Sequence, residues 1–178
     1  MKLNYNFYNQ HVVDVAKNLL GKRLFCGTFF GIIAETEAYR GSEDEASHAS
    51  KGVTPRSSVM FGLSGRAYVY MIYGMYYCFN IVCEPLGQPA AVLIRGLRMT
   101  DIFLDGPGKI CRYLSINKKY NAYDIVKSNY LYLKNGFLVD EKDYIATSRY
   151  GIKKSLDKKW RFVLNKNFFS NKIYDFID

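Results

Sequence analysis

The segment from residue 66 to residue 83, RAYVYMIYGMYYCFNIVC, constrains the fold most strongly, because it alternates like two strands joined by a tight reversal. Tyr68, Tyr70 and Ile72 fall on one side of the first strand. Residues 73 to 75 turn the chain, and residues 76 to 82 return beside the first strand. The sequence therefore predicts a β-hairpin with aromatic side chains along its length and at its tip.

Other segments add helices and further strands to this hairpin. The spacing of apolar residues predicts a helix over residues 11–20 that ends at Gly21. Further expected elements are a hairpin over 23–39 with its turn near Gly27, a strand over 88–99, a Gly/Pro turn opening a helix within 101–116, and strands with turns over 129–165. Together they predict a mixed, mainly antiparallel α+β fold.

Negative charge is concentrated in one short stretch of a basic chain. The chain has 16 Asp and Glu against 25 Lys and Arg, a formal charge of +9. The stretch SEDEASH predicts a short helix with a capping box between Ser42 and Glu45. Acids in a first helical turn offset the helix dipole, which accounts for Glu43, Asp44 and Glu45. Glu37 is left without such a role.

Two interpretations of the preceding strand remain open from the residues alone. Alternation over IIAETEAY places Glu35, Glu37 and Tyr39 on one face. That face is either a polar surface in water or part of a site. One possible site is a divalent-metal nuclease centre, in which Glu43 or Asp44 joins Glu35 and Glu37.

Composition narrows the class of protein further. No apolar run approaches the roughly 18 residues of a membrane span, and the first residues lack the pattern of a secretory signal. We therefore expect an intracellular protein that does not enter a membrane. The four cysteines, at positions 26, 78, 83 and 111, form no CxxC pair, so a structural zinc site is not favoured.

Two turns suggest contact with nucleic acid. Tyr73 on a tight turn of a basic protein has the form of a wedge that unstacks a DNA base step, although an exposed hairpin tip explains it equally simply. The turn GPGKI before a helix could hold phosphate with Lys109, or could be an ordinary glycine turn. It lacks the spacing of a Walker loop.

These motifs together resemble a known family. AETEAYRGSEDEASH, TPR, YVYMIYGMYYCFNIV, AVLIRGL and DGPGKICRYLSIN follow one another as in the alkyladenine (3-methyladenine, MPG-type) DNA glycosylases. The likeness covers nearly the whole chain. It implies one mixed domain over residues 1–178, with a curved, mainly antiparallel β-sheet core, a protruding β-hairpin and flanking helices.

The resemblance also implies an activity. Such an enzyme would flip alkylated or deaminated purines out of duplex DNA and hydrolyse the N-glycosidic bond, leaving an abasic site in base excision repair. It would act as a monomer on double-stranded DNA, without cofactor or metal. The preferred lesion stays open among 3-methyladenine, 7-methylguanine, hypoxanthine and ethenoadenine.

Roles for individual residues follow from their positions in the family's motifs. Glu37 would be the general base that activates water, and Arg95 would help to hold that water. The substrate-binding residues would be Tyr39, His48, Tyr70, Asn80 and Ile152. The DNA-binding residues would be Tyr73, Met75, Thr54, Arg56 and Lys109. No residue is assigned to a metal.

Three alternatives accompany this interpretation. The same scaffold could bind damaged DNA without excising a base. The metal-dependent nuclease described above is the second alternative, and a lysine Schiff base on Lys109 is the third. Arg40, which follows the pocket tyrosine where the longer family members carry an apolar residue, leaves the contacts at the pocket edge undecided.

Overall fold

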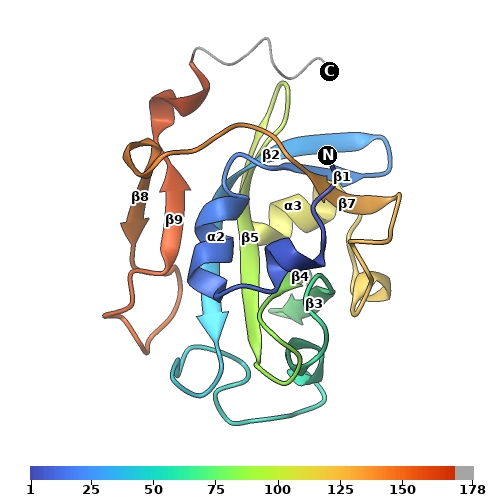
Figure 1. Cartoon of the computed structure of the whole chain (residues 1–178), viewed down its shortest axis with the longest axis vertical. Coiled ribbons are helices and arrows are strands. Elements are labelled where there is room, and N and C mark those ends of the chain that lie inside the picture. Colours follow the sequence, from blue (N-terminus) through green and yellow to red (C-terminus); the bar gives the residue numbers. More distant parts are fainter. Residues whose placement is uncertain (171–178) are drawn as a thin grey trace.

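The computed structural model describes residues 1–170 and is built around one nine-stranded sheet with antiparallel ladders (Figure 1). The strands are β1 (Arg23–Cys26), β2 (Phe29–Arg40), β3 (Ala67–Ile72), β4 (Tyr76–Val82), β5 (Ala90–Arg98), β6 (Phe103–Asp105), β7 (Leu131–Lys134), β8 (Tyr144–Thr147) and β9 (Arg161–Leu164). The sheet runs β3–β4–β5–β2–β1–β7, with β6 paired to β5, β9 to β2 and β8 to β9. The predicted α+β class with a curved antiparallel sheet is confirmed.

Short helices cover this sheet. The α-helices are α1 (Tyr5–Tyr8), α2 (Val12–Leu19) and α3 (Pro107–Tyr113), and 3₁₀ helices span Ser58–Phe61, Lys118–Tyr120, Glu141–Asp143 and Lys166–Phe169. Helix α2 packs on β2 and β5, while α3 packs on β4 and β5 (Figure 1). Across residues 1–170, none of the helices has the length and apolar character needed to cross a bilayer.

The contact between α2 and β2 shows which face of β2 is covered by the helix and which face carries the side chains of the residues next to Thr36. Helix α2 buries Val12, Val15, Ala16 and Leu19, as its spacing predicts. The hydroxyl of Thr36 on β2 donates a hydrogen bond of 2.8 Å to the carbonyl of Ala16. Because neighbouring side chains on a strand point to opposite faces, the residues on either side of Thr36 are directed away from α2.

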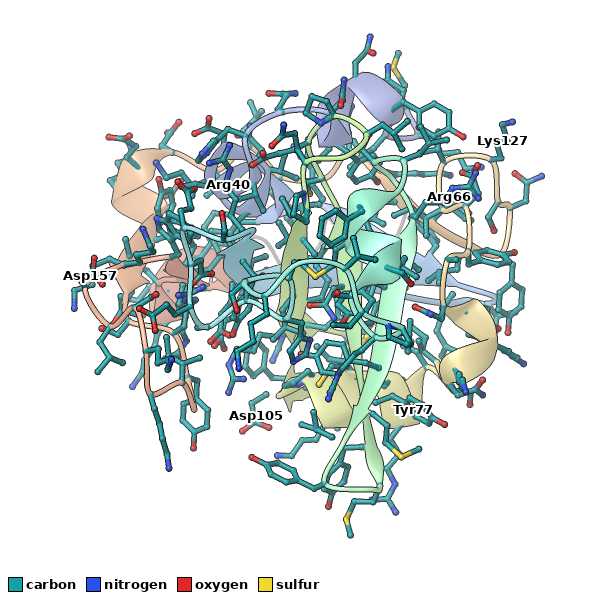
Figure 2. The ribbon with its side chains drawn as sticks, turned by 90° about the horizontal axis from the view of Figure 1, so that it is seen from below. Arg40, Arg66, Tyr77, Asp105, Lys127 and Asp157 are labelled. Carbon is teal, nitrogen blue, oxygen red and sulfur yellow. The ribbon has the colours of Figure 1, made fainter. Side chains whose placement is uncertain are left out.

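The β3–β4 hairpin forms as predicted and extends beyond the rest of the chain (Figure 2). At its turn, Met75 N–H donates to Ile72 O over 3.1 Å. The two central residues have positive φ, 51° at Tyr73 and 69° at Gly74. A tyrosine in this region costs roughly 1–2 kcal/mol in backbone strain, which glycine avoids. The side chain of Tyr73 is 86% exposed.

The predicted helix over residues 42–48 is wrong. Residues 41–52 form turns, and Ser42 caps no helix. Each acid instead has a basic partner: Arg40 for Glu43, Arg149 for Asp44, and Lys154 for Glu45. Two of these partners lie more than 100 residues away in the sequence, so pairing across the fold prevails over the local capping pattern.

Candidate active site

A cavity of about 750 Å³ opens between the β3–β4 hairpin, β2, β5, the turn before α3 and the segment after β8. Of the residues expected to act in binding or catalysis, those that line it are Glu37, Tyr39, His48, Tyr70, Tyr73, Asn80, Arg95, Lys109 and Ile152. The rest of the wall includes Met60, Tyr68, Tyr76, Cys78, Leu93 and Tyr150. Six tyrosines therefore line the cavity, together with one fully buried carboxylate.

That carboxylate is Glu37, which is 0% exposed. Its Oε2 accepts a hydrogen bond of 2.7 Å from the hydroxyl of Tyr39. Its Oε1 accepts one of 2.7 Å from the backbone N–H of Tyr150. Burial raises the pKa of Glu37, while these two hydrogen bonds and the charges of Arg95 and Arg161 oppose the rise. Glu37 therefore has the environment of a general base: a fixed orientation and a greater affinity for protons than an exposed glutamate.

Arg95 approaches Glu37 from β5. Its Nε lies 3.5 Å from Glu37 Oε1 and 2.9 Å from Glu35 Oε1. The ring of Tyr150 lies against the guanidinium, whose carbon is 4.4 Å from the ring centroid. Arg95 is thus held on one side by carboxylates and on another by an aromatic ring, at the wall of the cavity.

His48 and two tyrosines form a compact aromatic group in the cavity wall. His48 Nδ1 lies 2.9 Å from the hydroxyl of Tyr68. Burial of the ring, with the positive charge of Arg56 nearby, lowers the pKa of His48 to about 4. His48 is therefore neutral at pH 7, and its two ring nitrogens offer one donor and one acceptor.

The slot between His48 and Tyr70 is closed in this structure. The two rings meet edge to face with centroids 4.6 Å apart. A base stacked on both rings would need them to separate, so one of the two side chains must move before a base enters between them. Nearby, the side-chain amide of Asn80 is 2% exposed and donates to the carbonyl of Tyr68 over 3.1 Å, which fixes its orientation.

The residues expected to contact DNA divide into two groups. Tyr73 and Lys109 line the cavity, and Lys109 forms an ion pair with Asp105. Figure 2 shows Asp105 beside the hairpin. Met75 is 65% exposed on the hairpin turn but does not line the cavity. The other two, Thr54 and Arg56, also lie outside the lining.

Thr54 and Arg56 have contacts of their own within the fold. Thr54 forms a turn with Ser57, whose N–H donates to Thr54 Oγ1 over 3.1 Å. Arg56 donates to the carbonyl of Met71 over 3.1 Å, and its guanidinium carbon lies 4.8 Å from the ring centroid of Tyr70. Arg56 therefore supports one face of a cavity tyrosine while its own surface stays exposed.

Comparison with known proteins shows the family of the chain. The family model for methylpurine-DNA glycosylase (MPG) matches residues 6–168. The chain belongs to this family. It is 48% identical over 163 residues to a protein of Sodalis glossinidius, covering 90% of this chain and 95% of that protein.

Two further relatives of the methylpurine-DNA glycosylase family have similar identity. A protein of the Wolbachia of Culex pipiens is 51% identical over 160 residues, covering 88% of this chain and 86% of that protein. A protein of Ehrlichia chaffeensis is 48% identical over 168 residues, covering 91% of this chain and 92% of that protein. All three carry the name "Putative 3-methyladenine DNA glycosylase".

Arg40 is not at the edge of the cavity. Its Nε donates to Glu84 over 2.8 Å, and its Nη1 pairs with Glu43. Figure 2 shows it well away from Asp105 and the hairpin. The departure from the family pattern at this position therefore falls on an ion-pair cluster with the buried Glu84 and the exposed Glu43, outside the cavity lining.

Glu35 and Glu37 lie close together, but the third carboxylate that the nuclease alternative needs does not join them. Glu43 pairs with Arg40 and Asp44 with Arg149, whereas Glu35 is held by Arg95. Within residues 1–170, no group of three or more His, Cys, Asp or Glu side chains is arranged to hold a metal ion. The arrangement in this family member favours acid–base chemistry by one carboxylate.

Two contributors to the site have no local signal in the sequence. The Tyr150 N–H that orients Glu37 comes from 113 residues further along the chain. Arg149 beside it makes two hydrogen bonds with Asp44, of 2.5 and 2.7 Å, and a third with the carbonyl of Ala38. Its guanidinium carbon lies 4.6 Å from the ring centroid of Tyr39. The resemblance to the family assigns a role in this segment only to Ile152, as a substrate-binding residue.

We expect Asp44→Ala to destabilise the protein strongly. Asp44 and Arg149 both have fully buried side chains, so the substitution leaves an uncompensated guanidinium in the interior. The expected loss is about 3–5 kcal/mol in the free energy of unfolding. Urea denaturation followed by circular dichroism measures it.

The matched control is Glu45→Ala, one residue along the same loop. It removes the pair with Lys154, in which both side chains are more than 60% exposed. Such an exposed pair contributes about 1 kcal/mol or less. Equal losses for the two variants would show that the buried pair does not hold the loop.

Proposed function

We propose that the chain is a 3-methyladenine DNA glycosylase that removes alkylated or deaminated purines from double-stranded DNA in base excision repair. The observation that carries this proposal is the single buried carboxylate of Glu37 in a cavity walled by tyrosines. The family membership and the names of the relatives support it. We further propose that residues 1–178 act as one glycosylase domain, as a monomer and without a metal.

In the proposed reaction, Glu37 is the general base. Its carboxylate takes a proton from a water molecule, whose oxygen forms a bond to C1′ of the flipped nucleotide. The N-glycosidic bond breaks, and the base leaves with the bonding electrons. The negative charge of Glu37 also stabilises the oxocarbenium-like sugar as it develops. Tyr39 and the Tyr150 N–H keep the carboxylate in place throughout, and Arg95 helps to hold the water.

The aromatic wall accounts for selection of the damaged base. Tyr70 would stack on one face of the flipped base, with Tyr39 and His48 on the other. Alkylation makes a purine electron-poor, and a tyrosine face attracts such a ring in the manner of a cation–π interaction. A neutral His48 would hydrogen-bond to the edge of the base. The fixed amide of Asn80 would exclude guanine by clashing with its exocyclic amino group. Ile152 would close the cavity beside them.

The hairpin and the basic side chains around the mouth would bind the duplex. Tyr73 would enter the space vacated by the flipped nucleotide, with Met75 beside it, since both are exposed at the hairpin turn. Base–aromatic stacking is worth roughly 1–3 kcal/mol, enough to offset much of the cost of extruding a base. Lys109, Thr54 and Arg56 would contact phosphates, which fix the position of the DNA without reading its sequence.

We expect Glu37→Gln to abolish excision while the protein stays folded and bound to damaged duplex. The amide can still accept from Tyr150 and can donate to the hydroxyl of Tyr39, but it cannot take a proton from water. Single-turnover excision should fall by about 10²–10⁴-fold. Abasic-site formation on oligonucleotides carrying each candidate lesion, with EDTA present, measures the rate.

Three results would contradict this assignment. Excision retained by Glu37→Gln would remove Glu37 as the base. Strand cleavage that EDTA abolishes would favour the metal-dependent nuclease. A wild-type protein that binds the lesion tightly, yet leaves the base attached at high protein-to-DNA ratios, would be a non-catalytic damage-binding protein.

Tyr73→Ser tests the role of the hairpin tip. We expect weaker binding to lesion-containing duplex and slower excision, because the space left by the flipped nucleotide is no longer filled. The melting temperature should change little, since the side chain is 86% exposed. A large fall in melting temperature would assign Tyr73 to the packing of the hairpin.

A further inference from the structure

Glu35 binds two arginines with one oxygen atom. Arg95 Nε donates to Glu35 Oε1 over 2.9 Å, and Arg161 Nε donates to the same oxygen over 2.6 Å. The same two nitrogens lie 3.5 and 4.0 Å from Glu37 Oε1. Two carboxylates and two guanidinium groups therefore form one cluster. Only Glu37 and Arg95 of the four reach the cavity lining.

The backbone of β2 and β5 is irregular at this cluster. The register shifts on both sides of Glu35, which leaves Ala34 without a partner on β5 and Arg95 without a partner on β2. Such bulges redirect side chains and recur beside functional sites. Glu35 packs closely on β5: a Cβ atom added to Gly96 would lie 2.7 Å from the Cβ atom of Glu35. On the opposite edge, Arg161 of β9 pairs in register with Glu37.

Loss of the negative charge of Glu35 and loss of the positive charge of Arg161 would have opposite effects on how strongly Glu37 is stabilised as a carboxylate. Without Glu35, the remaining carboxylate beside both arginine Nε atoms is Glu37, and the long ion pairs of 3.5 and 4.0 Å would shorten to hydrogen bonds on the oxygens that must accept the proton from water. Without Arg161, one of the two positive charges beside Glu37 is lost. Both arguments follow from the attraction between opposite charges in a poorly solvated site.

We propose that Glu35 is a positioning residue: by accepting the hydrogen bonds of Arg95 and Arg161, it keeps their Nε atoms at 3.5 and 4.0 Å from Glu37, outside hydrogen-bond distance, and Arg161 helps to keep Glu37 ionised. The proposal rests on the proposed function, in which Glu37 is the general base. The other groups that face Glu37 are the hydroxyl of Tyr39 on β2 and the N–H of Tyr150. The thiol of Cys78 on β4 also interacts electrostatically with the carboxylate of Glu37.

The pH dependence of single-turnover excision tests this arrangement. Because burial raises the pKa of Glu37, the wild-type rate should fall as the pH drops through a midpoint above the usual range of a glutamate. Arg161→Gln should move that midpoint up by roughly one pH unit, since the carboxylate loses a stabilising positive charge. Glu35→Gln should move it down and lower the plateau several-fold, because a more strongly paired carboxylate is a weaker base.

Arg161→Lys is the matched control, because it keeps the positive charge and should keep the wild-type midpoint. Equal midpoints in the wild type, Glu35→Gln and Arg161→Gln would overturn the proposal, as would a uniform loss of rate at every pH. If Glu35→Gln fails to fold, the difference in midpoint between Arg161→Gln and Arg161→Lys tests the proposal. If an Arg161 variant fails to fold, the difference between Glu35→Gln and the wild type tests it.

A second measurement separates this proposal from the proposed function. Carbon-13 NMR of the Glu37 carboxyl group follows its titration without any DNA. The same opposite shifts in the two variants would support the positioning role even if the chain excised no base. Unchanged titration would overturn it even if excision were fast.

Discussion

The buried ion pair between Asp44 and Arg149 holds the candidate site together. It joins the loop after β2 to the segment after β8, and both side chains are removed from water. Removing two charges from water is costly, and the cost is offset only when the geometry is good and further hydrogen bonds are made. Here Arg149 bonds both oxygens of Asp44 and also the carbonyl of Ala38.

This pair acts on the site through its neighbours in the chain. Arg149 lies against the ring of Tyr39, and the next residue, Tyr150, donates its N–H to Glu37. Tyr39 donates to the other oxygen of the same carboxylate. Both hydrogen bonds that orient Glu37 therefore depend on residues in contact with, or adjacent to, one guanidinium group.

The hairpin, the long strands and α2 could be predicted because their signals are local. Alternation over residues 66–83 and helical spacing around Val12 to Leu19 each describe one element that buries one face. The helix predicted for the stretch SEDEASH does not form, because its acids pair with basic side chains from the far end of the chain and the local capping pattern is overridden. The Tyr150 contact and the bulge at Arg95 could not be predicted, since both exist only once β2 has met β5 and the segment after β8.

The left-handed backbone at Tyr73 and Gly74 has a consequence for the proposed entry of the hairpin tip into DNA. Most of the conformational ordering of the hairpin turn is complete before any duplex arrives, because few other backbone shapes fit the hydrogen bond from Met75 to Ile72. In the proposed function, a tip with a preformed backbone would contact successive base pairs without refolding at each one. Weakly stacked, damaged positions would then yield to it first, and discrimination would begin in the double helix itself, ahead of the cavity.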